Sequence, residues 1–121
     1  MKKLVLLILF LVFPTSVYSQ ATGTSKLIFD QSAPTLTEAN SYIYRYYPDT
    51  AVSGIPLTTV CTGTTSPFTC SAAFPAFTPG SHTLSLTAAS SASPTSESGK
   101  SALLSFTFIL IPSIPTNPRI G

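Results

Sequence analysis

The sequence predicts an all-β protein, an antiparallel β-sandwich built from about six short strands. Apolar and polar residues alternate with a period of two in several stretches, most clearly at 84–88 and 104–108. A strand with one buried face requires this alternation. Turn-forming residues separate the stretches at short intervals, and no amphipathic helical pattern follows the N-terminal segment.

Residues 1–19 are predicted to be a secretory signal peptide. Two lysines precede an almost wholly apolar run over 4–13, Pro14 ends the run, and cleavage is expected after Ser19. A membrane anchor is the alternative, but the run has only about half of the roughly 20 residues that span a bilayer. We therefore expect no integral membrane span after cleavage, and a secreted, periplasmic or cell-surface location.

Removal of residues 1–19 takes away two of the six basic residues, so the formal net charge of +2 falls to zero. The remaining chain has the length of one small domain, assigned to 20–110, with a proline-rich arm over 111–121. Its few basic residues form no patch of the kind that binds a phosphate backbone. Nucleic acid is therefore not expected as a partner.

Cys61 and Cys70 are the only cysteines, and an oxidising compartment favours a disulfide between them. Gly63 and Pro67 between them suit a chain reversal, so the bridge would close one loop and stabilise the fold by about 2 to 3 kcal/mol. A metal or redox pair is the alternative. The eight intervening residues do not give CxxC spacing, and one histidine cannot complete a zinc set, so we expect no metal and no cofactor.

The first predicted strand covers 26–30, with Leu27 and Phe29 pointing one way and Ile28 the other. The polar segment 20–25 ahead of it is expected to be frayed, and it leaves little room for an earlier strand.

The second predicted strand covers 41–47 and is the most strongly patterned segment. Three tyrosines alternate on one face, while Arg45 and Tyr47 lie on the other. Packing across neighbouring strands is the favoured interpretation of these aromatic residues. The alternative is a binding surface, for which Arg45 and Tyr47 are the candidate contacts.

Two weaker strands are predicted over 57–62 and 68–74, on either side of the turn that the cysteines bracket. The last two strands, 84–88 and 104–108, face each other across the segment 89–101. That segment is rich in serine and alanine, has no apolar periodicity, and is predicted to be an exposed loop.

Four motifs occur in a characteristic order: LxFD at 27–30, YxYxY at 42–46, FTPGS at 77–81 followed by LxLTA at 84–88, and ESxxS at 97–101. Over about residues 26 to 108 the chain thereby resembles the fibronectin type III family, in its bacterial and phage branch. The resemblance implies a two-sheet, immunoglobulin-like sandwich.

The chain departs from that family pattern at two places. His82 occupies the position of the family's corner tyrosine, and we expect it to be structural, with a hydrogen bond to the loop backbone. The family's first strand is missing or replaced, because too few residues precede Leu27. Residues 112–120 resemble the opening segment of a following domain of that family. The arm over 111–121 is also a candidate to fill the vacant edge in this copy or in a neighbour. Its three prolines count against a strand.

No catalytic constellation is recognisable in the sequence, so we do not expect an enzyme. The first hypothesis is an exported module for binding or surface interaction. Its partner would be a protein or a surface glycan, contacted through the loops 48–55 and 89–101. The alternative is a phage-encoded or cell-surface assembly protein that self-associates through the open edge or the arm.

Overall fold

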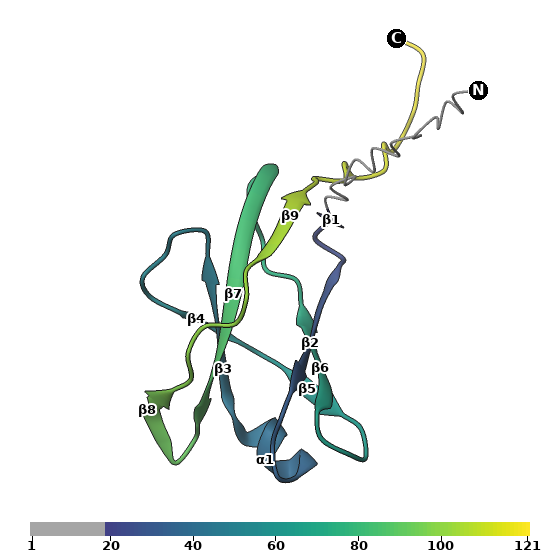
Figure 1. The fold of residues 1–121 in the computed structure, drawn as a ribbon. Coiled ribbons are helices and arrows are strands. Elements are labelled where there is room, and N and C mark those ends of the chain that lie inside the picture. Colours follow the sequence, from purple (N-terminus) through teal and green to yellow (C-terminus); the bar gives the residue numbers. More distant parts are fainter. Residues whose placement is uncertain (1–18) are drawn as a thin grey trace, which may run out of the picture.

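A computed structural model describes residues 19–121 and confirms the all-β prediction. Two mostly antiparallel sheets pack against each other as a sandwich (Figure 1). The predicted signal peptide and its alternative, a membrane anchor, lie outside the described residues except for Ser19. The elements are β1 (Ser19–Ala21), β2 (Lys26–Gln31), α1 (Leu36–Ser41), β3 (Ile43–Pro48), β4 (Ile55–Leu57), β5 (Val60–Thr62), β6 (Phe68–Ala73), β7 (Gly80–Ser90), β8 (Ser93–Glu97) and β9 (Leu104–Phe108).

The larger sheet has the strand order β1-β9-β7-β3-β4, with β8 also paired to β7, and the smaller sheet has the order β2-β6-β5. All pairs are antiparallel except β1 with β9, which is parallel. Strand β7 is therefore the centre of the larger sheet, and β6 is the centre of the smaller one.

The period of two gives the sandwich its core. In β2, Leu27 is buried while Ile28 is 65% exposed, as the alternation predicts. The buried side chains form two clusters, and Phe29 and Leu57 pack against both. One cluster contains Ala21, Leu27, Phe74, Leu84, Phe106 and Phe108; the other contains Ala33, Ala39, Tyr44, Cys61, Phe68 and Cys70.

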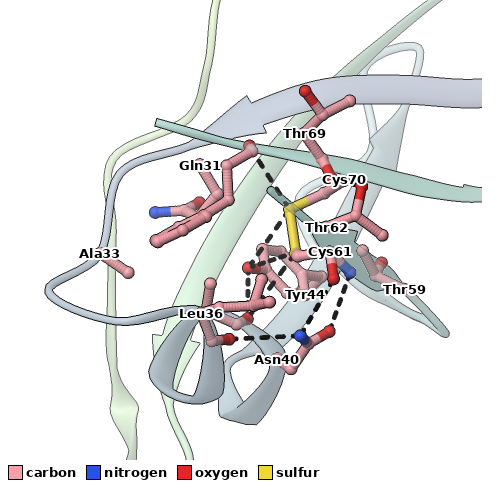
Figure 2. Close-up of a disulfide and its surroundings, with 12 residues drawn as sticks. Gln31, Ala33, Leu36, Asn40, Tyr44, Thr59, Cys61, Thr62, Thr69 and Cys70 are labelled. Atoms are coloured by element: carbon pink, nitrogen blue, oxygen red, sulfur yellow. Dashed lines mark hydrogen bonds between the residues drawn. A yellow bond between two sulfur atoms is a disulfide. The ribbon is translucent and has the colours of Figure 1, made fainter. Parts of the chain in front are cut away.

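The predicted disulfide between Cys61 and Cys70 is present, and it joins directly opposed residues of β5 and β6. Figure 2 shows Tyr44 beneath the bridge. Its hydroxyl donates to the carbonyl oxygen of Ala39 at 2.7 Å and lies 3.5 Å from the sulfur of Cys61. Burial, with a smaller contribution from Tyr42, raises the pKa of Tyr44 to about 12, so the phenol stays neutral beside the sulfurs.

The N-terminal prediction is corrected in one respect. The segment 20–25 was expected to be frayed, yet Gln20 and Ala21 form part of β1 and pair with β9. Ala21 is only 4% exposed, because its methyl group joins the core cluster at that end. Strand β1 has three residues and belongs to the larger sheet, and within residues 19–121 no strand precedes β2 in the smaller sheet.

The helix α1 was not expected, because six residues are too few to show a helical period. A local signal does precede it: the hydroxyl of Thr35 accepts a hydrogen bond from the backbone N–H of Glu38 at 3.1 Å. Threonine followed three residues later by glutamate is the capping-box pattern of a helix N-terminus.

Two other expectations are wrong in detail. The stretch predicted as one strand over 57–62 divides between the sheets, because β4 pairs with β3 and β5 pairs with β6. The predicted loop 89–101 contains the end of β7 and all of β8. Every residue of β8 is exposed, so neither of its faces needed an apolar pattern. The count therefore rises from about six strands to nine within residues 19–121.

Asn40 offers a test of how α1 is attached to β5. Its side chain bonds both backbone groups of Cys61, at 2.8 and 3.1 Å. We expect Asn40→Ala to lower the free energy of unfolding by about 1 to 2 kcal/mol, because those groups lose their partner. Urea denaturation of the oxidised protein measures this difference, with Asn117→Ala in the exposed arm as the control. Equal midpoints for the two variants would contradict the attachment.

Candidate functional site

The two edges of the smaller sheet differ in how they are covered. At the β5 edge, the Asn40 side chain accepts from the backbone N–H of Cys61 and donates to its carbonyl oxygen, as a neighbouring strand would (Figure 2). At the opposite edge, β2 pairs only with β6 among residues 19–121. One edge is therefore capped by a side chain and the other is open.

The disulfide register determines which backbone groups face the open edge. The Cys61 groups point to Asn40, so in antiparallel pairing those of Cys70 point to β2, where its partner is Phe29. Backbone groups alternate in direction along a strand. The N–H and C=O groups of Ile28 and Asp30 therefore point outward, to the open edge.

An apolar groove runs beside this edge. A hollow of about 290 Å³ lies between β2 and the segment 99–104, and Leu84 and Leu86 of β7 contribute to its lining. A second hollow continues towards β1 and shares Leu27, Ile28 and Leu104 with the first. We call these two adjoining hollows together the β2 groove. It opens onto the core of the sandwich where a further strand would lie.

Serine side chains fix the wall of the groove that faces β2. The N–H of Ser98 donates to the carbonyl oxygen of Ala88 at 2.8 Å, and its hydroxyl accepts from the Ala88 N–H at 3.0 Å. Ser101 makes the same pair of bonds with Leu86, both at 2.9 Å. Between β8 and β9, the hydroxyls of Ser98 and Ser101 thus accept the β7 hydrogen bonds that the carbonyl groups of a neighbouring strand would otherwise accept.

The predicted surface contacts Arg45 and Tyr47 lie on the outer face of the larger sheet, around Glu97. The hydroxyls of Tyr47, at 2.6 Å, and of Thr87 donate to the same oxygen of Glu97. A guanidinium nitrogen of Arg45 lies 3.7 Å from that oxygen. The hydrogen bond from Thr87, and then the one from Tyr47, lower the pKa of Glu97.

Tyr47 is only 7% exposed, because its own chain covers it. The ammonium group of Lys100 lies 4.4 Å from the ring centroid, and a side-chain carbon added at Gly54 would lie 2.8 Å from the ring. Arg45 therefore pairs with Glu97, and Tyr47 contacts both Glu97 and Lys100 of its own chain. No local signal could have revealed this, because Tyr47 and Glu97 are 50 residues apart.

His82 lies near the start of β7, with both ring nitrogens bonded. Nδ1 is 2.9 Å from a carboxylate oxygen of Asp49, and Nε2 is 2.7 Å from the backbone carbonyl oxygen of Thr78. The bond to Asp49, and then the one to Thr78, raise the pKa of His82, and the bond from His82 lowers the pKa of Asp49. Both partners are acceptors, so the geometry favours the protonated imidazole.

Residues 19–121 contain no group of three or more His, Cys, Asp or Glu placed to hold a metal ion. No helix in that range is long and apolar enough to cross a membrane.

The chain matches no protein-family model, and no curated protein matches its sequence. The fibronectin type III resemblance therefore stays a prediction.

The stability of the fold is expected to depend on pH through His82 and Asp49. The pKa of His82 is raised, so its contribution is complete below the ordinary value of 6.5 and is lost as the pH rises through the folded value. The pKa of Asp49 is lowered, so its contribution is present above the ordinary value of 3.8 and is lost as the pH falls through the folded value. The pair should stabilise the fold most between these ordinary values.

Urea denaturation at about pH 5 and about pH 9 measures this effect. The wild type should lose more stability than His82→Gln over that range, because glutamine does not titrate. A parallel pH dependence in the two proteins would show that the pair contributes nothing.

Proposed function

We propose that this protein is an exported, non-catalytic interaction module that binds an extended segment of a partner protein by adding it as a strand beside β2. The open six-residue edge of β2 carries the proposal. Backbone groups on such an edge are a template for another strand.

The other sheet edges offer a visiting strand much less. Strand β4 has three residues and contains Pro56, and the edge strand β8 contains Pro94; proline has no N–H to donate. Strand β5 is capped by Asn40, and β1 has only three residues. Strand β2 is longer, contains no proline and borders the groove.

The β2 groove favours a polypeptide over a surface glycan. A strand beside β2 would satisfy the backbone of Ile28 and Asp30, and alternate side chains would enter the groove. Leu27, Leu86 and Leu104 in its lining suit apolar side chains. The expected ligand is an extended segment with apolar residues at every second position.

The compartment and the family are parts of the same proposal. The lysine-led apolar segment within residues 1–19 and the Cys61–Cys70 disulfide support export to an oxidising compartment. The two-sheet sandwich and the motif order support membership of the fibronectin type III family. The absence of a catalytic motif in the sequence supports a binding role.

A phage-displayed library of random peptides of about ten residues tests the binding mode. Peptides selected on the immobilised protein should show apolar residues with a period of two. Their affinity should fall about ten-fold or more in Ile28→Pro, because an outward-facing donor is removed while the bonds to β6 are kept. Ile28→Val keeps the N–H and is the matched control.

Amide hydrogen exchange on the wild type gives a second measurement, independent of the folding of the proline variant. Bound peptide should slow exchange at Ile28 and Asp30. Peptides that bind Ile28→Pro as tightly as the wild type, or that leave both amides unprotected, would exclude strand addition at β2.

A further inference from the structure

We infer that the strand received by β2 comes from a second copy of this chain, whose residues 110–114 (LIPSI) enter the β2 groove. We call these residues the donor segment. The inference rests on the proposed function, because it names the partner that the open edge receives.

The donor segment is apolar and uncovered in a single copy. Leu110 and Ile111 are each 65% exposed, and Ile114 is 86% exposed. The last hydrogen bond that holds this end to the body joins the N–H of Ile109 to the carbonyl oxygen of Ala21 at 2.8 Å. Beyond it the chain runs away from the sandwich (Figure 1). The segment therefore leads away from its own sandwich and does not line the β2 groove of its own copy.

The proline in the donor segment has the right phase for pairing. Alternate residues of a strand direct their backbone groups to the same side. If Ile111 and Ser113 face β2, then Leu110, Pro112 and Ile114 direct theirs away from it. Pro112 then has no donor to lose at the interface, which is where proline is tolerated in an edge strand. Pro115 has the opposite phase and would end the pairing.

The same phase places the apolar side chains in the groove. In the antiparallel register that sets Ile111 opposite Ile28, Leu110 is opposite Phe29 and Pro112 is opposite Leu27. Phe29 and Leu27 point into the sandwich, so Leu110, Pro112 and Ile114 would enter the groove. On the outer face, Ile111 would cover Ile28, which is otherwise 65% exposed.

Charge does not oppose the contact. Besides His82, residues 20–121 carry four basic and four acidic side chains, so two copies have little net charge to repel each other. Donor and acceptor are different surfaces of the chain, so the contact can repeat from copy to copy.

The exported protein, purified with its disulfide intact, tests the inference by light scattering after size exclusion over a range of concentrations. The wild type should show masses above the monomer that rise with concentration. Leu110→Asp with Ile114→Asp should give a monomer, because charge is placed in the groove. Ile120→Asp changes an equally apolar, fully exposed residue of the arm outside the donor segment, and it should behave as the wild type.

A mixing experiment makes the assignment specific. Ile28→Pro keeps the donor segment but has a damaged edge, and the double aspartate variant keeps the edge but has a damaged donor segment. Each should be monomeric alone, and together they should form a one-to-one complex.

Each remaining outcome has a definite meaning. A wild type that is monomeric at all concentrations, or an Ile120→Asp variant that dissociates like the double variant, would overturn the assignment of the donor segment. Selected peptides that still protect Ile28 and Asp30 would then leave the proposed function standing with a different partner. Failure of both measurements would exclude the edge as a binding site.

Discussion

The pairing of Cys61 with Cys70 is the interaction on which the smaller sheet depends. It joins β5 and β6 at one opposed pair, and Asn40 takes up the backbone groups of Cys61 that this register turns outward. The backbone groups alternate in direction through β6 to β2, where those of Ile28 meet no strand within residues 19–121. The register fixed by the Cys61–Cys70 disulfide at the β5 side of the sheet therefore matches the one in which the backbone groups of Ile28 and Asp30 face the open edge of β2.

The larger sheet is completed by polar side chains. Ser98 and Ser101 supply the bonds that β7 lacks between β8 and β9, and Glu97 gathers donors from the outer face. The bonds of Ser101 to Leu86 hold one wall of the β2 groove without filling it. Polar groups on the outer face of the larger sheet therefore have hydrogen-bond partners, whereas the hollow beside β2 is open.

Much of the fold could be predicted from the sequence because a strand with one buried face alternates apolar and polar residues with a period of two. Leu27 and Ile28 have the predicted opposite exposures, and the cysteines could pair only with each other. Elements with no buried pattern could not be found in this way. Strand β8 is exposed on both faces, α1 is too short for a helical period, and β1 is recognisable only through the burial of Ala21. The open edge was predicted, but the groove beside it depends on side chains brought together from β2, β7 and β9.

The Asn40 cap also has a consequence for valency. A three-stranded sheet with two free edges could accept a strand at each, and ligands could then link sheets in both directions. The Asn40 side chain occupies the outward backbone groups of Cys61, so this sheet can accept a further strand only at its β2 edge. A visiting strand would therefore always add to the same side of the sheet. One side chain on a six-residue helix thereby limits the sheet to one visiting strand.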